Sequence, residues 1–372
     1  MKRSFVLCGL LCLCGALFVS CRGRGGEKQV RVEDGVEIIS HPAVPQNRDF
    51  GRTLKLEERL RIRDEGGGFF FSSPLYPDIA ADGSVFVEDN NQLLKFSPDG
   101  RFLKNLITNG QGPGEFTGFY RFALHGNEIY ANDNRAKIVR MDLEGRLIEE
   151  MRLEQPGWLQ DATKSWRFLM LIMMPPPKER TGKLANMEWR VGWVSMDGGT
   201  LGGEHVFPAR MFVDRSVRLV WDKFLWALDR DRDLVYVSRT REYAVELLDL
   251  NAGRVVRSFK RDYPRVKYRM GENEAKIYQQ YNPPPKEYES DILDLFVSGN
   301  LLWVRTSTED ARKGVLIDVF DEKGDYLDNF YVPVKGPIMA VRGDILFVKE
   351  TNEEGEITIV LYKNLEPIST PA

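Results

Sequence analysis

Hydrophobic residues in this chain fall into short runs, rich in β-branched and aromatic side chains, that are separated by Gly, Asp and Asn. In residues 82–106, three such runs follow Gly83, and an acidic turn ends at Gly100. Residues 125–153 repeat this order, starting from Gly126. The first glycines of the two units are 43 residues apart. A period of this length, with several strands per unit, is typical of β-propeller blades.

Four weaker copies of the unit follow, at 166–207, 233–259, 299–332 and 343–368. Several of their runs are apolar on both faces, which is the pattern of strands packed between neighbouring sheets. The sequence therefore predicts an all-β fold, a six-bladed β-propeller with rim insertions that occupies residues 51–372.

Two of the repeats are followed by longer stretches, and the second of these contains residues 263–292. Within it, the sequence ENEAKIYQQY at 272–281 predicts a short helix that ends before Pro283. We interpret both stretches as rim insertions, which carry binding in many folds. Tyr278 and Tyr281 are candidate ligand-binding residues, because Tyr combines a large contact area with a polar tip. The alternative is a lid that only packs over one blade.

A ring of sheets needs its two ends joined. Residues 52–63 place apolar residues among charged ones and precede the first complete blade. We therefore predict that they pair with the last blade, at 338–368. The local alternative is pairing within 52–106.

The N-terminus has the features of an export signal. Lys2 and Arg3 are followed by a short, uncharged apolar run that ends at Cys21. The sequence LFVSC resembles a bacterial lipobox, so we expect cleavage after residues 1–20 and a lipid on Cys21. Residues 21–50 then form a polar tether to the propeller. An uncleaved signal anchor is the alternative.

The expected location is the outer membrane, with the lipid on Cys21 as the membrane contact. Arg22, Gly23 and Arg24 follow the Cys, whereas surface-exported lipoproteins of similar sequence tend to carry acidic residues there. We therefore favour the periplasmic face over surface exposure.

Replacing Cys21 with Ser should release the protein from the membrane fraction or leave its signal uncleaved, because the lipid would have no attachment point. Membrane fractionation and the mass of the mature N-terminus measure this. Unchanged membrane association with a normally processed N-terminus would contradict lipid anchoring.

Charge and composition limit the function classes. The formal net charge is −3, and we find no sustained basic stripe, so nucleic acid is not an expected partner. The three His residues lie far apart in the sequence and form no pair with zinc-ligand spacing. All four Cys residues lie at positions 8–21, so the mature chain has no intramolecular disulfide. No motif identifies a cofactor or a catalytic nucleophile.

The sequence NGQGPGEF at 109–116 carries a family resemblance. It does not suit phosphate, because Glu115 and Phe116 stand where a phosphate loop has Lys and Ser or Thr. With the segment that follows it, it resembles the NHL repeat. It resembles more closely the six-bladed β-propeller lipoproteins of Bacteroidetes-type bacteria, in which a GxGPGEF crossover and an insertion containing three prolines recur. This resemblance implies that the loop is the corner between two blades.

Two polar clusters occupy the same place in successive units, directly after the first strand of each. Sugar-lactonase propellers of related shape bind a divalent cation with such acids and amides, and oxygen ligands suit hard cations. Asn and Asp are also ordinary turn formers, and the resemblance to NHL repeats implies a structural role, which we favour. These candidate residues are Asp89, Asn90, Asn132, Asp133, Asn134 and Arg135.

Trp158 is a further candidate, because it lies in a loop-like context in which an aromatic ring could stack on a sugar. The resulting hypothesis is a lipid-anchored binding or protein-interaction module, whose ligand is an unknown protein, small molecule or carbohydrate. The alternative is an NHL- or lactonase-like enzyme with a divalent cation at the channel mouth. Acids and amides that converge on the channel axis from three or more blades would favour the enzyme.

Overall fold

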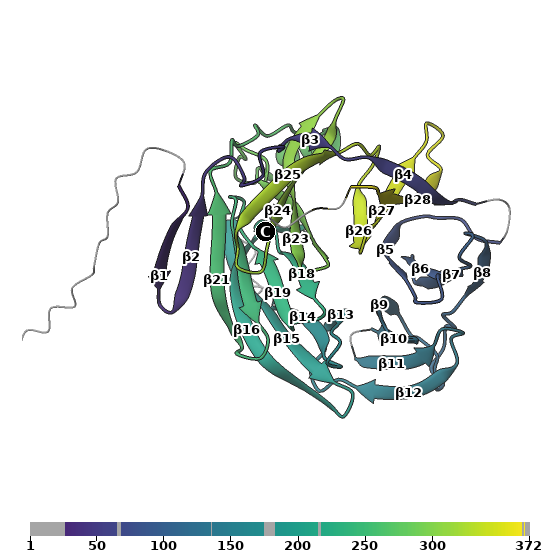
Figure 1. The fold of residues 1–372 in the computed structure, drawn as a ribbon. Coiled ribbons are helices and arrows are strands. Elements are labelled where there is room, and N and C mark those ends of the chain that lie inside the picture. Colours follow the sequence, from purple (N-terminus) through teal and green to yellow (C-terminus); the bar gives the residue numbers. More distant parts are fainter. Residues whose placement is uncertain are drawn as a thin grey trace, which may run out of the picture.

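Six antiparallel sheets surround a central channel in the computed structural model, which describes residues 27–64, 68–134, 136–174, 183–214, 217–366 and 368 (Figure 1). The sheets are the six blades that the repeats predicted, so the all-β propeller fold is confirmed. We call the first strand of each blade its inner strand, because these strands border the channel. The inner strands are β5, β9, β13, β18, β22 and β26.

The first three blades follow one another in chain order. Blade one contains β5 (Pro74–Ile79), β6 (Val85–Asp89), β7 (Gln92–Phe96) and β8 (Phe102–Asn105). Blade two contains β9 (Phe119–His125), β10 (Glu128–Asp133), β11 (Lys137–Asp142) and β12 (Leu147–Arg152). Blade three contains β13 (Trp158–Ala162), β14 (Phe168–Met174), β15 (Lys183–Ser195), β16 (Gly198–Asp214) and β17 (Val217–Val220).

The other three blades each take strands from the N-terminal part of the chain. Blade four contains β18 (Leu225–Asp229), β19 (Leu234–Ser238), β20 (Val245–Asp249) and β21 (Arg254–Arg261), extended by β2 (Val36–His41) and β1 (Gln29–Glu33). Blade five contains β22 (Ile292–Ser298), β23 (Leu301–Asp310), β24 (Gly314–Phe320) and β25 (Tyr326–Val332), extended by β3 (Arg52–Thr53). Blade six contains β26 (Ile338–Arg342), β27 (Ile345–Thr351), β28 (Ile357–Asn364) and β4 (Leu56–Ile62).

The hydrophobic core is divided into wedges between neighbouring blades. Phe86 of blade one packs with Phe122 and Ile129 of blade two, and comparable clusters lie at each of the other five junctions, including the one between blades six and one. Strands with both faces buried, such as β6, follow from this arrangement, because each sheet packs against a neighbour on either side.

Ring closure occurs at blade six, as predicted. Strand β4 pairs antiparallel with β28, with Leu60 opposite Leu361 and Ile62 opposite Ile359. An N-terminal strand thus completes the blade that the C-terminal strands build. Arg52 and Thr53 differ from the prediction, because they pair with β25 of blade five, and Leu54 N also donates to Tyr331 O of that blade (2.9 Å).

The tether predicted for residues 21–50 is wrong from Gln29 onwards. Strands β1 and β2 form a hairpin on the outer edge of blade four, where β2 runs parallel to β21 and buries Ile39 completely (Figure 1). Asp34 and Gly35 form its two-residue turn, both with positive φ, which is a strong hairpin signal. All five residues of β1 are exposed, and its sequence QVRVE mixes charged and polar residues with valines. This composition resembles that of a linker, so the sequence did not reveal the strand. Cys21 lies outside the described residues.

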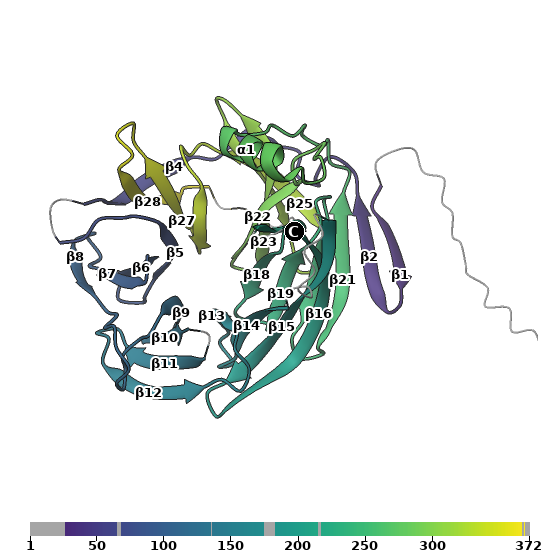
Figure 2. The ribbon, with the colours of Figure 1, turned by 180° about the vertical axis from the view of Figure 1, so that it is seen from behind.

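The helix prediction is confirmed, since α1 spans Glu272–Tyr281 and ends at Asn282 in the left-handed region, directly before Pro283 (Figure 2). A bridge between Lys267 and Tyr288 joins the two ends of this insertion. The earlier insertion is less irregular than expected, because much of it continues blade three as the long strands β15 and β16 and the short strand β17.

The glycine-rich loop at 109–116 is a corner between β8 and β9. Gly110 N donates to Phe116 O (3.0 Å), and Phe116 is buried between blades one and two. The Glu115 carboxylate folds back to accept from Gly112 N (2.7 Å) and occupies the space that a side chain at Gly110 would need. The loop therefore binds its own acid, in agreement with the corner that the resemblance implied.

Candidate binding site in the central channel

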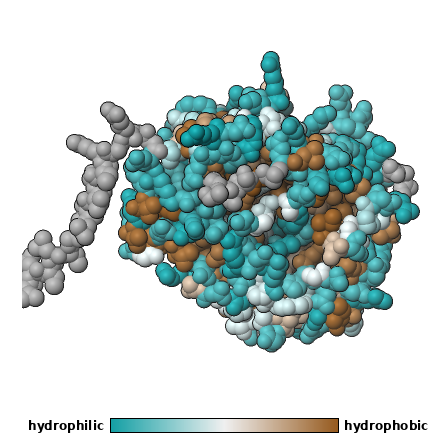
Figure 3. Space-filling model, in the orientation of Figure 1, coloured by the Kyte–Doolittle hydropathy of each residue, from teal (hydrophilic) through white to brown (hydrophobic). Residues whose placement is uncertain are grey.

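A cavity of about 660 Å³ lies in the channel and is lined by residues from the inner strands of all six blades. The inner strands run in the same direction around a propeller, so the position of a residue along its strand gives its depth. Elsewhere on the face seen in Figure 1, the surface is largely hydrophilic, with separate apolar patches (Figure 3).

Aromatic side chains gather towards the N-terminal ends of the inner strands. Tyr120 and Trp158 come from adjacent blades, and their ring centroids are 5.8 Å apart. Trp189 and Phe224 stack with a centroid distance of 5.3 Å. We call this end of the cavity the aromatic mouth, and it is lined by Tyr76, Tyr120, Trp158, Trp189, Phe224, Trp226 and Met339.

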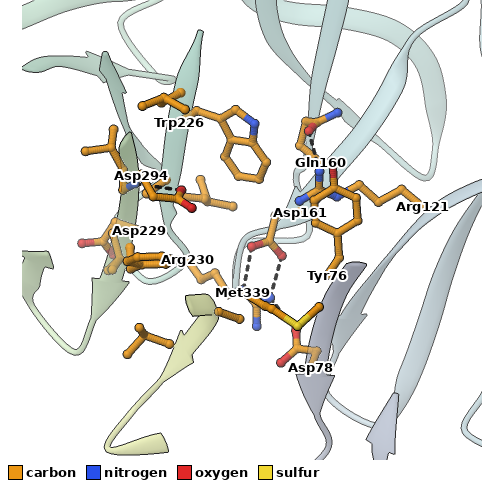
Figure 4. A pocket seen from close by; sticks show the side chains of 18 of the residues that line it. Tyr76, Asp78, Arg121, Gln160, Asp161, Trp226, Asp229, Arg230, Asp294 and Met339 are labelled. Atoms are coloured by element: carbon orange, nitrogen blue, oxygen red, sulfur yellow. Dashed lines mark hydrogen bonds and ion pairs between the residues drawn. The ribbon is translucent and has the colours of Figure 1, made fainter. Parts of the chain in front are cut away.

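Arg121 on β9 places a buried guanidinium in this mouth (Figure 4). Only 8% of the residue is exposed, and its single side-chain hydrogen bond among the described residues runs from Nη1 to Gln160 Oε1 (2.8 Å). In the part of the chain that the structure describes, its Nε has no hydrogen-bond partner. The guanidinium carbon lies 3.5 Å from the centroid of the Tyr76 ring and 4.9 Å from that of the Trp226 ring. The described residues place no carboxylate within ion-pair distance of it.

The pKa values of two acids near the mouth lie above their usual range. Burial raises the pKa of Glu88 to about 8, although the nearby Arg121 charge opposes the rise. Burial also raises the pKa of Asp294 to about 6, on the opposite blade five. The Asp294 carboxylate accepts a hydrogen bond from Leu295 N (3.0 Å), which is local to its own strand. At neutral pH Glu88 is therefore mostly neutral, whereas Asp294 is mostly ionised but forms no ion pair with Arg121 among the described residues.

A cluster of ion pairs crosses the channel further along the inner strands. Arg230 Nη2 lies 2.8 Å from Asp78 Oδ2 and 2.8 Å from Asp161 Oδ1 (Figure 4). Arg342 Nε lies 2.8 Å from Asp78 Oδ1. Arg230 follows the inner strand of blade four, and Asp78 lies on the opposite blade one, so the Arg230 side chain spans the axis. Burial alone would raise the pKa of Asp78, but the charges of Arg342 and Arg230 outweigh it and hold that pKa well below its usual range.

The predicted residues Asp89 and Asp133 have structural roles in the described region. Asp89 accepts hydrogen bonds from the backbone N–H groups of Ser72 and Ser73. Asp133 accepts in the same way from Thr117 and Gly118. Each carboxylate therefore holds the segment that enters the inner strand of its own blade, as expected of blade-stabilising turn residues.

The amides next to these acids also act within the fold. Asn132 Oδ1 accepts from Leu159 N (3.3 Å), which links blade two to blade three. Asn90 and Asn134 adopt positive φ in turns. Arg135 lies outside the described residues.

Of the predicted aromatic residues, Trp158 is the one that the structure places in the channel cavity, as the first residue of β13. Tyr278 and Tyr281 lie on α1 and are not among the cavity residues. The Tyr278 hydroxyl donates to Pro284 O (3.1 Å), so it holds the insertion together.

Sequence reasoning missed Tyr76, Arg121, Trp226 and Asp294, because each comes from a different blade and no local motif joins them. One signal was available. Arg121 is the one charged residue within the run FYRFAL at 119–124, in which most neighbouring residues are apolar. A cation in such a strand needs a specific explanation.

The residues that the structure describes include no group of three or more His, Cys, Asp or Glu side chains that could hold a metal ion. Carboxylates from blades one and three do converge on the axis, but arginines occupy them. Within the same described part of the chain, no helix has the length and apolar character needed to cross a membrane.

Comparisons with known proteins agree with this architecture. Residues 79–157 match a family model described as a six-bladed β-propeller. An exported protein of Bacteroides fragilis has a similar fold, with a TM-score of 0.52 and 13% identity, over 88% of this chain and 100% of that chain. A duf4221-family protein of Bacteroides vulgatus gives 0.51 and 10%, over 84% and 98%. None of the curated proteins matches the chain in sequence. The sheet topology shows that the chain folds as a six-bladed β-propeller, which agrees with the description of the family model that matches residues 79–157.

Proposed function

We propose that the protein is an exported, lipid-anchored binding module that holds a small polar ligand in the aromatic mouth of its central channel. The observation that carries this proposal is the cavity of about 660 Å³, with aromatic walls and a buried Arg121 that lacks a counter-ion. Cavities of about 300–1,000 Å³ with aromatic linings and a few polar groups are typical of small-molecule sites.

The ion-pair cluster supports binding rather than passage through the ring. Arg230 reaches across the axis to Asp78, so charged side chains fill the channel at that depth. A molecule that enters through the aromatic mouth therefore meets this cluster of paired charges. Pairing also opposes the lactonase alternative, because Asp78 and Asp161 already neutralise arginines and would have to leave them to hold a cation.

The proposed location depends on the N-terminal segment. An apolar run that ends at Cys21 would place a lipid ahead of the folded domain, on the periplasmic face of the outer membrane. The similar protein of Bacteroides fragilis is itself described as exported. The membrane is then the partner that localises the protein, and the channel ligand is a separate, soluble partner.

The test is a thermal-shift screen of the full chain against a library of small polar metabolites and sugars. We expect hits that raise the unfolding temperature of the wild-type protein but not of Met339→Trp, because the larger side chain would fill the mouth. Leu103→Trp is the matched control, since Leu103 is exposed on the outer strand β8 of blade one.

Met339→Trp must itself unfold within a few degrees of wild type for the comparison to hold. If it does not, Trp226→Ala, which opens the same wall, takes its place. A library without hits, or hits that both mouth variants bind as well as wild type, would contradict the proposal. Conversion of a hit to a new product, followed by mass spectrometry, would favour the enzyme alternative.

A further inference from the structure

The ligand class can be inferred from the charge that the mouth leaves uncompensated. Other arginines in the described region have acidic partners, since the buried Arg261 lies 2.7 Å from Asp318 and the half-buried Arg230 pairs with two aspartates. Arg121 is as buried but has none within ion-pair distance. A buried cation without a partner is costly, so a site of this kind is electrostatically incomplete until an anion arrives.

No acidic side chain of the described residues serves as a counter-ion for Arg121. The charges of Asp161 and Glu88 both act on Arg121, but Asp161 already pairs with Arg230. Among the described residues, Glu88 Oε2 has no hydrogen-bond partner, and burial raises the pKa of Glu88 to about 8. The group is therefore mostly neutral at pH 7, where it leaves the Arg121 charge in place. Above pH 8 the Glu88 carboxylate would compete with any anionic ligand.

The guanidinium is held in position rather than merely buried. Gln160 fixes Nη1, and the Tyr76 ring lies against the guanidinium plane at 3.5 Å. Tyr76 itself has φ +46° at a bulge in β5, between Leu75 and Asp78. A left-handed Tyr is strained, and such strain concentrates where a side chain must be aimed at a site.

The opposite wall provides a carboxylate that can accept hydrogen bonds from a ligand's hydroxyl groups, together with aromatic ring surfaces. Asp294 faces Arg121 across the mouth, and its carboxylate has only a local backbone partner (Figure 4). Trp226 and Trp158 add aromatic surface to the cavity lining. An aromatic acid would leave Asp294 without a donor, and a neutral sugar would leave Arg121 without an anion.

We infer that the mouth binds an acidic monosaccharide of the hexuronate class. Its carboxylate lies on the Arg121 guanidinium, where a planar fork matches two carboxylate oxygens. Its C–H face packs on the aromatic walls, and its hydroxyl groups donate to Asp294. This inference depends on the proposed binding function and assigns its substrate class.

The experiment is isothermal titration of the full chain with D-glucuronate and D-galacturonate at pH 7. D-glucose, the methyl ester of D-glucuronate and phenylacetate are the comparison ligands. We expect a uronate to bind roughly tenfold to a hundredfold more tightly than its methyl ester or the neutral sugar, the value of one or two charge-assisted hydrogen bonds. The ester removes the charge without changing the protein, so this arm does not depend on a variant that folds.

Arg121→Met should abolish the preference for the acid over the ester, and Arg121→Lys should retain part of it, because Lys keeps the charge but loses the fork. Because the wild-type cation is unpaired, Arg121→Met should not lower the unfolding temperature of the ligand-free protein. A large loss of stability would show that Arg121 is a structural residue and would contradict the inference.

Equal affinity for uronate and ester, or tighter binding of phenylacetate than of either uronate, would also overturn it. If uronates fail while other library hits depend on Met339, the inference falls and the proposed function stands. If nothing binds in the mouth, both fall.

Discussion

Replacing Asp318 with Ala should destabilise the propeller by about 3–5 kcal/mol, the usual cost of removing one partner from a buried ion pair. Asp318 is fully buried in β24 of blade five. It accepts hydrogen bonds from Arg261 Nε of blade four (2.7 Å) and from the hydroxyl groups of Tyr243 (2.7 Å) and Tyr326 (2.8 Å). Its loss leaves a buried guanidinium and two phenols without their acceptor. Chemical denaturation with an intrinsic fluorescence readout measures the change.

Two controls separate the ion pair from a general effect of losing a carboxylate. Asp344→Ala removes an exposed aspartate and should change the unfolding free energy by less than about 1 kcal/mol. The double variant Asp318→Ala, Arg261→Met should be more stable than Asp318→Ala alone, because it no longer buries an unpaired charge. A single variant as stable as wild type would show that the junction between blades four and five does not depend on this pair.

Truncating Ile62 to Ala should lower the unfolding free energy by about 2–5 kcal/mol, as for other fully buried aliphatic side chains. Ile62 ends the strand that closes the ring, and it packs with Val85 of blade one and Phe347 of blade six. The variant therefore weakens both the last blade and its contact with the first. Urea denaturation of wild type and variant gives the difference.

Arg59→Ala is the matched control for closure, because it lies on the same strand β4 but is exposed. It should change stability by less than about 0.5 kcal/mol. If Ile62→Ala were equally neutral, the pairing of β4 with β28 would contribute little, and ring closure would depend on contacts elsewhere.

The blades could be predicted from the sequence because each is a local unit. Gly83 and Gly126 begin equivalent hairpins, and hydrophobic runs between such turns specify strands without long-range information. Helix α1 was equally local, since the prolines after it set its end. Closure by β4 followed from geometry, because a ring leaves two strands in need of partners.

The cavity could not be predicted in this way. Tyr76, Arg121 and Trp226 lie on three different inner strands, and their proximity follows only from the way the blades pack around the axis. The Asp and Asn clusters were more visible in the sequence because they form motifs, yet Asp89 and Asp133 act within the turns of their own blades. The hairpin of β1 and β2 was missed because an exposed edge strand has the composition of a linker.

The order of synthesis gives the pairing of β4 with β28 a further consequence. Strand β4 is among the first strands to leave the ribosome, whereas its partner β28 is the last. Until then it is an unpaired edge, a known hazard for aggregation. Glu57, Glu58 and Arg59 are exposed on it, and charged residues at an edge discourage pairing with other chains. A chain that stops before β28 keeps this edge open, so an incomplete product stays recognisable to proteases and chaperones.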